Sequence, residues 1–339
     1  MSLKGKDIAR MIGVSPATVS LVLNNRPGVS DKKRAEIIRK IKELNCGYML
    51  KDELIDNGNI GFVVYKREGS IVDESPFFNY LLEGITDTVR KYGYNLNFIY
   101  VNKQMPLEEQ KRQMESVKCK GLIIYAVEMF YDDLNVFKQT GIPFVILDNS
   151  FRENDVDAVA INNVQGTNKA LLHLFNMGHK RIGYIKSKVV INSFIERYAA
   201  FEQALNEKGF VFDNNDLIEV GYSEREVKRD TLAYIEKNNT FPTAFFAEND
   251  LIGCNAVLAF KEAGIGVPND ISVIGFDDRP ICTMIEPQLS TIEVPKHILG
   301  PQAVELLISK MDYGRDYSVK VEVGTKLMIR KSVKDLTRE

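Results

Sequence analysis

The sequence predicts an α/β protein in which residues 1–50 form helices and a long region of parallel sheets follows. Strand-like runs alternate with amphipathic segments from Ile60 onward, and such alternation is typical of parallel sheets covered by helices. The strands are apolar almost throughout, as strands covered on both faces must be. The alternating region is longer than the length expected for a single sheet, and its length is typical of two lobes.

Eight strands are expected along this region. They lie at 60–65, 95–101, 121–127, 143–148, 181–185, 217–221, 243–247 and 271–275. Segments with helical periodicity lie between them, at 81–92, 108–117, 167–177, 197–208 and 252–263. The helices are therefore expected on both faces of the sheets.

The N-terminal region predicts three short helices. In the first helix three apolar residues share one face: Ile8, Met11 and Ile12. Gly13 is expected to end this helix, Ser15 is a good N-cap for the second, and Pro16 occupies its first position. The second helix runs to about Leu23, and the third covers about 31–44. Two short helices joined by a tight turn form a helix-turn-helix, whose second helix enters the DNA major groove.

The charge of this region differs from that of the rest of the chain. Residues 1–50 hold 10 Lys and Arg against 4 Asp and Glu, a formal charge near +6. The remainder holds 34 basic and 42 acidic residues, near −8, so the net charge of −2 hides a basic head on an acidic body. A basic head is attracted to duplex DNA through the release of counterions.

The string K-D-I-A-R-M-I-G-V-S-P-A-T-V-S-L-V-L-N, residues 6–24, resembles the opening of LacI/GalR-family transcription regulators. Their pattern is roughly D-V-A-x-x-A-G-V-S-x-x-T-V-S-x-V-x-N, and nearly every fixed position matches. The resemblance implies base contacts from Pro16, Ala17 and Leu21, none of which can make a bidentate hydrogen bond to a base. Ala17 and Leu21 could touch thymine methyls. Five residues are better placed for phosphates: Ser15, Thr18, Ser20, Asn24 and Arg26.

The pattern breaks in the hinge that follows. The family usually has L-x-Y-x-P-N-x-x-A-R-x-L, a short helix that inserts a leucine into the minor groove. Here the Pro and the Ala-Arg pair are absent, and three acidic residues occur: Asp52, Glu53 and Asp56. Two interpretations stay open, a wedge formed by Leu54 or Ile55 and a plain acidic tether.

Further motifs extend the resemblance to about Ser332. They are S-P-F-F at 75–78, G-H-K-R-I at 178–182, A-E-N-D at 247–250, V-P-N-D-I-S-V-I-G-F-D-D at 267–278 and P-Q-L-S-T-I at 287–292. They imply a two-lobed, periplasmic-binding-protein-like core with a small molecule between the lobes, and crossings near 162–163, 293–294 and 323–324. The expected domains are a helix-turn-helix DNA-binding domain (1–46), a hinge (47–58), an N-terminal lobe (59–162 and 294–323) and a C-terminal lobe (163–293 and 324–339).

Candidate ligand-binding residues lie where strands end, since ligands of open α/β sheets bind outside the carboxyl ends of strands. Four polar residues follow strands: Asp148, Asn162, Asn249 and Asp277. The resemblance places five residues in the effector cleft: Asp148, Ser193, Arg197, Asn249 and Asp277. It also implies Phe78 and Tyr222 as aromatic walls. The alternative role of Asp148, Asn162 and Asn249 is to cap a turn between a strand and a helix.

This residue set suits a polyhydroxylated ligand, because carboxylates accept hydrogen bonds from hydroxyls and arginine donates two N–H groups in a fork. We expect a sugar or sugar derivative, with a nucleobase or a phosphorylated metabolite as the alternative. Lys186 or Lys188 could meet a ligand anion or be solvated surface residues.

An enzyme is the main alternative class. No G-x-G-x-x-G follows a strand, and neither a G-x-x-x-x-G-K-[ST] loop nor a G-x-S-x-G elbow occurs. The four cysteines lie far apart and the three histidines show no metal-ligand spacing. We therefore expect no catalytic residue, no cofactor and no metal. Without a membrane-length apolar run or a signal sequence, we expect a cytoplasmic protein with no membrane partner.

Together these features predict a sequence-specific transcriptional regulator, a repressor controlled by a small molecule. A homodimer would read two half-sites about one helical turn apart, so the operator is expected to be pseudo-palindromic. Control requires that the ligand bind two states of the core unequally. A degenerate regulator with weak DNA binding is the other interpretation.

Overall fold

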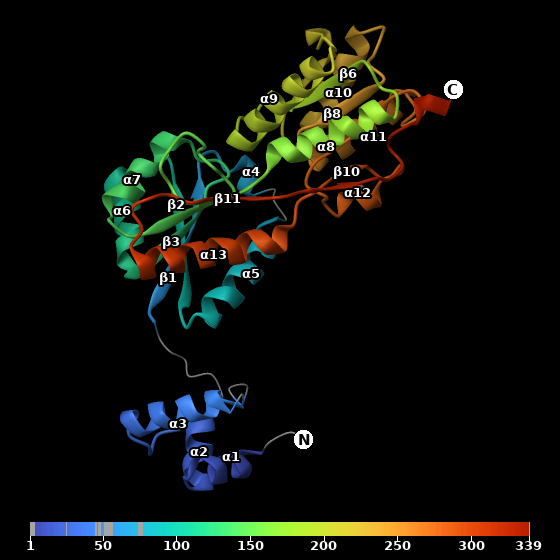
Figure 1. Cartoon of the computed structure of the whole chain (residues 1–339). Coiled ribbons are helices and arrows are strands. Elements are labelled where there is room, and N and C mark those ends of the chain that lie inside the picture. The colour runs from blue at the N-terminus through green and yellow to red at the C-terminus, as the bar shows by residue number, and fades with distance from the viewer. Residues whose placement is uncertain are drawn as a thin grey trace. The chain divides into compact units, whose positions relative to one another are not determined.

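The computed structural model describes residues 4–24, 26–44, 46, 49–50, 57–73 and 77–338 (Figure 1). The chain divides into two compact units, Met1–Asn57 and Gly58–Glu339. The predicted wedge residues Leu54 and Ile55 lie outside the described residues, as do Ser75 and Pro76. Among the residues described, no helix combines the length and apolar character needed to cross a bilayer.

The N-terminal unit contains the three predicted helices, α1 (Gly5–Ile12), α2 (Pro16–Leu23) and α3 (Asp31–Glu43). Gly13 follows α1 with a φ of 74°, the left-handed conformation that glycine adopts easily. Ser15 begins α2, because its Oγ accepts a hydrogen bond from the backbone N–H of Thr18 at 3.0 Å. Both ends of the tight turn are thus fixed by local chemistry.

The core of this unit corrects one detail of the sequence analysis. Its buried residues are Ile8, Ala9, Val19, Val22, Leu23, Ile37, Ile41 and Cys46. Met11, expected on the inner face, is 57% exposed, whereas Ala9 is 1% exposed. Positions 8, 9 and 12 form a helical stripe just as positions 8, 11 and 12 do, so periodicity could not distinguish them. The stripe that contains Ala9 is the one buried against α2 and α3.

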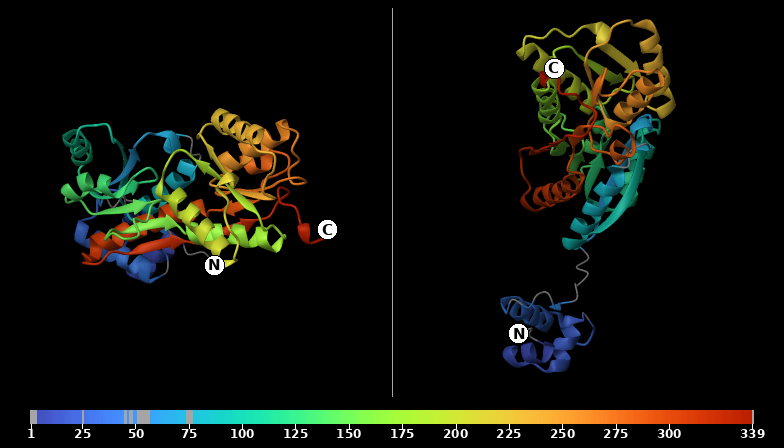
Figure 2. Two further views of the ribbon diagram at one scale, coloured as in Figure 1. Left: turned by 90° about the horizontal axis from the view of Figure 1, so that it is seen from above. Right: turned by 90° about the vertical axis from the view of Figure 1, so that its right-hand side faces the viewer.

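The second unit contains two parallel sheets, which define its two lobes (Figures 1 and 2). The N-terminal lobe has the strand order β11-β5-β4-β3-β1-β2. Its strands are β1 (Asn59–Lys66), β2 (Asn95–Asn102), β3 (Cys119–Tyr125), β4 (Phe144–Leu147), β5 (Ala158–Ile161) and β11 (Lys320–Val323). Its helices are α4 (Ser70–Asp73), α5 (Phe77–Lys91), α6 (Leu107–Ser116), the 3-10 turn Tyr131–Leu134, α7 (Asn135–Gln139) and α13 (Lys296–Tyr313).

Alternate residues of β1 bury against the two helical layers of this lobe. Phe62 and Val64 belong to the core that includes residues of α5 and α13. Val63 and Tyr65 belong to the opposite core, with residues of α6 and α7. This burial on both faces explains why the strand is apolar throughout.

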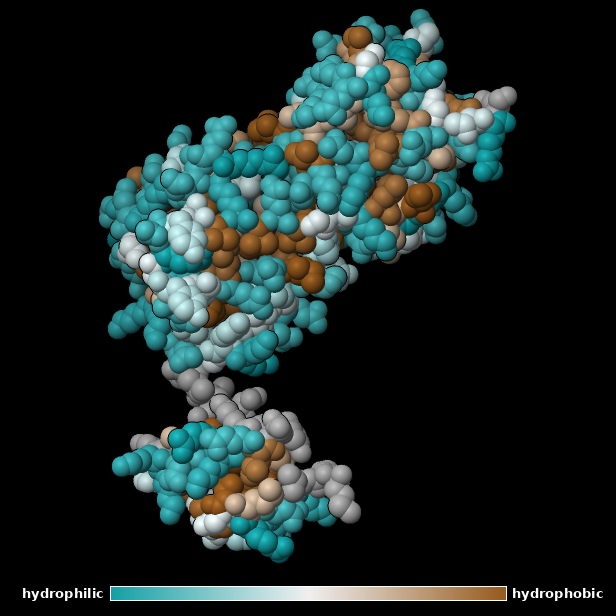
Figure 3. Space-filling view, in the orientation of Figure 1, coloured by the Kyte–Doolittle hydropathy of each residue, from teal (hydrophilic) through white to brown (hydrophobic). Residues whose placement is uncertain are grey.

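Two glycines let α5 and α13 approach closely. A Cβ at Gly84 would lie 2.8 Å from Cδ of Pro301, and one at Gly300 would lie 2.7 Å from the carbonyl oxygen of Leu81. A larger residue at Gly84 would therefore require the ring of Pro301 to move, and one at Gly300 would require the backbone at Leu81 to move. On the face that Figure 3 shows, apolar side chains gather around these two helices within a mainly hydrophilic surface.

The C-terminal lobe has the strand order β7-β6-β8-β9. Its strands are β6 (Ile182–Ser187), β7 (Leu217–Val220), β8 (Ala244–Ala247) and β9 (Ser272–Ile274). Its helices are α8 (Asn163–Asn176), α9 (Asn192–Glu207), α10 (Glu224–Lys237), α11 (Asp250–Glu262) and α12 (Ile281–Met284), with 3-10 turns at Asn214–Asp216 and Leu336–Arg338. All eight predicted strands are present in the two sheets, within a few residues of the expected limits.

The chain passes from one lobe to the other at three places. They lie between β5 and α8, between β10 (Thr291–Glu293) and α13, and between β11 and β12 (Lys326–Met328). β10 and β12 pair antiparallel as a two-stranded sheet. The α/β fold with two lobes and parallel sheets is as predicted, while the residue limits given above for the domains stay predictions.

Candidate functional site

A buried arginine lies at the centre of the candidate site. Arg197 of α9 is 3% exposed, and its Nε donates a hydrogen bond to Oδ1 of Asn163 at 2.9 Å. Its Nη1 donates to the carbonyl oxygen of Glu248 at 2.5 Å, and its Nη2 lies 3.4 Å from Oδ1 of Asp277. The guanidinium carbon lies 3.7 Å from the ring centroid of Phe276. These contacts from three elements hold the planar group in one orientation.

Two carboxylates from different lobes accompany this guanidinium. Asp277 follows β9, and its Oδ2 lies 3.5 Å from Nε of Arg279, so Asp277 contacts two arginines. Asp148 follows β4 and is 7% exposed. Burial, followed by repulsion from the Asp277 carboxylate, raises the pKa of Asp148 to about 7 against the opposing effect of Arg197. Both aspartates have positive φ, 65° at Asp148 and 111° at Asp277.

This pKa predicts how Asp148 affects stability. Because its pKa in the folded chain, about 7, lies above the ordinary 3.8, the folded state holds a proton that the unfolded state releases. The free energy of unfolding therefore falls as pH rises from about 4 to about 7, by roughly 4 kcal/mol from this group. Asparagine carries no charge and tolerates the left-handed backbone of this position. We expect Asp148→Asn to melt above the wild type at pH 8, with the difference shrinking towards pH 4.

Thermal melts of both proteins across this pH range measure the effect. The matched control is Asp316→Asn, which removes an exposed carboxylate and should leave the wild-type pH profile unchanged. Superimposable profiles of Asp148→Asn and the wild type would contradict the assignment.

A second polar group surrounds Tyr222. The Tyr222 hydroxyl accepts hydrogen bonds from Nδ2 of Asn249 at 3.0 Å and from Nη2 of Arg279 at 3.5 Å. Asn249 also caps α11, since its Oδ1 accepts the backbone N–H of Ile252 at 3.0 Å. Asn249 therefore both caps the N-terminus of α11 and belongs to the polar group around Tyr222. Arg279, 7% exposed, was not predicted from the sequence. The sequence feature that could have indicated Arg279 is its position directly after the pair Asp277 and Asp278.

A small inner cavity of about 30 Å³ lies among these side chains. It is lined by Ile71, Tyr125, Val127, Asp148, Ile161, Ile191, Ser193, Phe194, Arg197, Tyr222, Asn249, Asp277 and Arg279. Six of the eight predicted ligand-binding residues therefore meet there. Both lobes contribute to the lining, so the cavity lies between them.

The other two predicted residues have different surroundings. Phe78 packs in the N-terminal lobe, with ring centroids 5.8 Å from Phe62 and 5.9 Å from Tyr125. Asn162 caps α8, because its Oδ1 accepts the backbone N–H of Gln165 at 2.8 Å. Neither residue lines the inner cavity.

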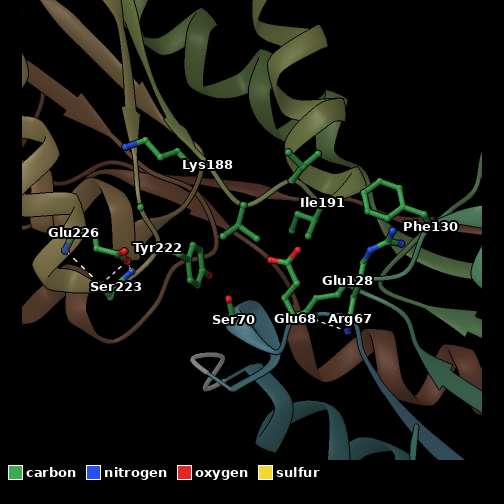
Figure 4. A pocket seen from close by; sticks show the side chains of 13 residues that line it. Arg67, Glu68, Ser70, Glu128, Phe130, Lys188, Ile191, Tyr222, Ser223 and Glu226 are labelled. Atoms are coloured by element: carbon green, nitrogen blue, oxygen red, sulfur yellow. Dashed lines mark hydrogen bonds between the residues drawn. The ribbon is translucent and has the colours of Figure 1, made fainter. Parts of the chain in front are cut away.

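A larger outer cavity of about 520 Å³ adjoins the inner one and shares Ile191 and Tyr222 with it (Figure 4). The N-terminal lobe contributes Arg67, Glu68, Ser70, Glu128 and Phe130. The C-terminal lobe contributes Lys188, Val189, Val190, Ile191, Gly221, Tyr222, Ser223 and Glu226. Sequence reasoning missed this cavity, since its walls are loops without a recognisable motif.

The loop after β1 is organised by one carboxylate, Glu128. Its Oε2 accepts the backbone N–H groups of Arg67, Glu68 and Gly69 at 2.8–3.1 Å, and its Oε1 accepts those of Ile71 and Val72 at 2.8 and 3.2 Å. Burial raises the pKa of Glu128, but these hydrogen bonds outweigh it and hold the pKa below the ordinary value. The carboxylate therefore stays ionised and fixes one wall of the outer cavity.

The two lysines of the 186–196 loop already have partners. Lys188 Nζ lies 2.8 Å from Oδ2 of Asp230. Lys186 Nζ lies 4.9 Å from the ring centroid of Tyr198. Among the described residues, no group of three or more His, Cys, Asp and Glu side chains could hold a metal ion.

The predicted DNA-contacting residues of the N-terminal unit lie on and beside α2. Six are exposed: Ser15, Pro16, Ala17, Ser20, Asn24 and Arg26. Thr18 and Leu21 are half-buried. Thr18 is held by Ser15, since their hydroxyl oxygens lie 2.7 Å apart. Leu21 lies near Gly28, where a Cβ would come within 3.4 Å of its Cδ1, so its side chain covers the turn before α3.

Two protein-family models match the chain. The model described as bacterial regulatory proteins, lacI family, matches residues 6–46, and the periplasmic binding protein-like domain matches residues 171–333. The HTH-type transcriptional repressor PurR of Pasteurella multocida is 30% identical over 336 residues, which are 97% of this chain and 98% of that protein. The two family models match the chain in the order of the predicted domains, with the DNA-binding model first.

Solved structures show the same fold. The transcriptional regulator CelR in complex with cellobiose has a TM-score of 0.73 at 22% identity, over 98% of this chain and 100% of that one. A LacI family transcriptional regulator from Enterococcus faecium with bound ribose has a TM-score of 0.68 at 26% identity, over 82% and 99%. The chain therefore belongs to the LacI/GalR family of regulators, as a DNA-binding transcriptional repressor with a ligand-binding domain.

Proposed function

We propose that a sugar or sugar derivative binds between the two lobes, with hydroxyls at the Arg197 cluster, and thereby changes the affinity of the repressor for its operator. The observation that carries this proposal is the buried Arg197–Asp277 pair, which faces a cavity together with Asp148 and Asn249. Such a set offers both donors and acceptors to neighbouring hydroxyls. The bound ribose and cellobiose of the two similar structures support the same class.

The charges of the cluster favour a neutral ligand over a phosphorylated one. Arg197 and Arg279 both contact Asp277, so each guanidinium already has a carboxylate neighbour. A phosphate dianion would have to compete with Asp277 for both arginines, whereas neutral hydroxyls can bind beside this pair. A nucleobase is the alternative that charge does not disfavour.

A thermal-shift screen tests the ligand class on the full chain. It compares free pentoses, hexoses and disaccharides with free nucleobases and sugar phosphates. A stabilising sugar that also changes operator affinity supports the proposal. Stabilisation by a nucleobase or a phosphorylated metabolite alone would replace it.

For DNA binding we infer that α2 contacts the operator through the residues predicted above. Pro16, Ala17 and Leu21 would face bases, and the exposed polar residues around them would contact phosphates. A hinge wedge at Leu54 or Ile55, the alternative to a plain acidic tether, would add a minor-groove contact. Because the side chains that face the bases are apolar, we expect sequence recognition to depend on contacts with thymine methyl groups.

Leu21→Ala provides the test of this readout. We expect the ratio of affinities for operator and scrambled DNA to fall by about three- to tenfold, because an apolar contact to a base is lost. Arg26→Ala is the matched control. It should weaken both DNAs alike and reduce the salt slope by about one, as a phosphate contact does.

Fluorescence anisotropy on fragments of the promoter of the protein's own gene cluster, titrated at several salt concentrations, measures both effects. A Leu21→Ala protein with unchanged preference would contradict the assignment. A steep salt slope without any sequence preference in the wild type would support a degenerate regulator.

We also propose that the repressor acts as a homodimer on a pseudo-palindromic operator. Three large apolar residues of the N-terminal lobe are exposed: Tyr80 of α5 by 49%, and Phe98 and Tyr100 of the edge strand β2 by 46% and 55%. α5 and β2 are in contact, so these residues belong to one region of the lobe. Exposed apolar clusters of this kind are typical of protein–protein contacts. Sedimentation of the free and the DNA-bound protein measures the stoichiometry.

A further inference from the structure

A cluster of cations lies at the end of the N-terminal lobe where the chain enters from the DNA-binding unit. Gly58 is the first residue of the second unit and directly precedes β1. Its carbonyl oxygen accepts the backbone N–H of Asn95 at 2.9 Å, which places the start of β2 beside it. Asn59 pairs with Cys119, which places the start of β3 on the other side. Four exposed cations lie at or just before these two strand starts: Arg90, Lys91, Lys118 and Lys120.

The charges of this cluster are not neutralised by neighbouring carboxylates. Among the residues that the structure describes, none of the four cations forms an ion pair or donates a side-chain hydrogen bond. Two exposed acidic residues lie near the cluster, Glu115 of α6 and Asp312 of α13, and neither pairs with it. This end of the lobe is therefore basic, although the chain after residue 50 is acidic overall.

The backbone at Lys118 has a conformation that a lysine rarely adopts. Its φ is 47°, in the left-handed region that favours glycine. The residue directly follows Val117, the C-cap of α6, where a left-handed residue commonly ends a helix. Glycine would adopt this conformation without strain, so the lysine lowers stability at a position where its side chain is not needed for packing. Asp148 and Asp277, which share the positive φ, belong to the candidate effector site.

A second irregularity of the backbone orients Lys120. β1 and β3 pair in parallel, but their register shifts after Asn59, so Lys120 between Cys119 and Gly121 has no partner in β1. A bulge of this kind changes the direction of a side chain. The Lys120 side chain lies along the entry point of the chain, since a Cβ at Gly58 would come within 3.2 Å of its Cε. Two separate departures from regular structure thus present neighbouring lysines at the same end of the lobe.

We propose that Lys118 and Lys120 bind phosphates of the operator, so that the second unit adds a sequence-independent DNA contact to those of α2. The segment 51–57 that joins the two units can span at most roughly 25 Å, so this end of the lobe stays within reach of the bound DNA. A lysine at a phosphate releases a condensed counterion, which strengthens binding most at low salt. Arg90 and Lys91 increase the positive potential of the same surface.

Fluorescence anisotropy of the full chain, titrated at several salt concentrations, tests this proposal. The probes are fragments of the promoter of the protein's own gene cluster and scrambled DNA of the same length. Lys118→Gly and Lys120→Gln should each weaken both DNAs alike, by about threefold or more at low salt, and reduce the salt slope by about one for each subunit. Lys180→Gln is the matched control, because it removes an exposed lysine that precedes β6 in the other lobe, and it should bind as the wild type.

Lys118→Gly also separates a lost contact from a damaged fold. Glycine takes the left-handed backbone without strain, so this variant should melt at or above the temperature of the wild type while it binds DNA more weakly. Weaker binding by a protein of equal or greater stability cannot come from unfolding. Lys120→Gln supplies the test if Lys118→Gly does not fold.

The salt slope and the control decide between the outcomes. Weaker binding with a reduced slope in both lysine variants, together with wild-type behaviour of Lys180→Gln, supports the proposal. Wild-type affinity and slope in the lysine variants would overturn it. Weaker binding with an unchanged slope would overturn it as well, because the lysines would then act within the protein and not on phosphates. An equal loss in Lys180→Gln would assign the effect to the overall charge of the chain and not to this surface.

Discussion

Replacement of Arg197 by methionine is expected to abolish the response to the effector and to lower the free energy of unfolding by about 3–5 kcal/mol. The guanidinium is a cation beside two buried acidic side chains, Asp148 and Asp277. Its removal leaves Arg279 as the remaining cation beside Asp277, at 3.5 Å, and takes from Asp148 the positive charge that lowers its pKa. It also removes the donors to Asn163 and to the carbonyl oxygen of Glu248. Methionine keeps much of the apolar length, so cavity formation contributes little.

Three further variants show which property of Arg197 matters. Arg197→Lys keeps the charge but not the planar fork, so it should restore part of the stability and little of the effector affinity. The double variant Arg197→Met with Asp277→Asn removes both charges and should recover stability without recovering the response. Arg225→Met, on the exposed surface of α10, is the matched control and should behave as the wild type.

Two measurements follow these variants. Chemical denaturation gives the free energy of unfolding, and operator release in fluorescence anisotropy gives the response to the effector. If Arg197→Met has the stability and the effector response of the wild type, the central role assigned to Arg197 is contradicted. A double variant no more stable than Arg197→Met would show that uncompensated charge is not the cause.

The sequence could predict the strands because burial on both faces leaves a strong signal. Segments such as F-V-I-L at 144–147 and A-F-F-A at 244–247 are fully buried and wholly apolar. The short connecting strands gave no such signal. β11, with the sequence K-V-E-V, is half-exposed and only four residues long. It is held in the sheet by pairing with β5, which depends on tertiary contact rather than on local pattern.

Part of the inner site could be predicted because three of its residues follow parallel strands, while Ser193, Arg197 and Tyr222 were expected there only from the family resemblance. Asp148, Asn249 and Asp277 come from three strands of two sheets, and strand ends of one sheet share an edge. Arg279 lies in the turn beyond β9, where periodicity gives no orientation. Its place beside Tyr222 arises from the fold of that turn, where its backbone N–H is held by Asp250 at 2.8 Å.

The outer cavity could not be predicted, because its walls are brought together only by the packing of the lobes. In one lobe Ser70 begins α4 and Phe130 lies in a loop, and in the other Val190 and Ser223 lie in loops. Each is unremarkable in its own segment. Phe78, which the resemblance implies as an aromatic wall, has its ring beside Phe62 and Tyr125, and its role in ligand binding stays a prediction.

Glu128→Gln is expected to have the second large effect, through the loop that forms one wall of the outer cavity. The amide keeps the shape but has one oxygen, so it can accept from only one of the two groups of N–H donors. If its oxygen faces Arg67, Glu68 and Gly69, its NH2 group faces the N–H groups of Ile71 and Val72. Hydrogen bonds to charged groups contribute about 1.5–3 kcal/mol each, so a loss of at least roughly 3 kcal/mol in the free energy of unfolding is expected.

The pH dependence gives this prediction its sign. The pKa of Glu128 in the folded chain lies below the ordinary 4.5, so its stabilisation is fully present above that value and is lost as pH falls through the lower folded pKa. The melting temperatures of Glu128→Gln and the wild type should therefore differ by a constant amount from pH 6 to 8 and converge in acid. Asp132→Asn, an exposed carboxylate nearby in the sequence, should show no such difference. Because the loop carries Arg67 and Ser70 of the outer cavity, effector affinity should fall while operator affinity without effector stays unchanged. A gap in melting temperature that persists unchanged into acid would mean that the five N–H groups do not depend on the charge of Glu128.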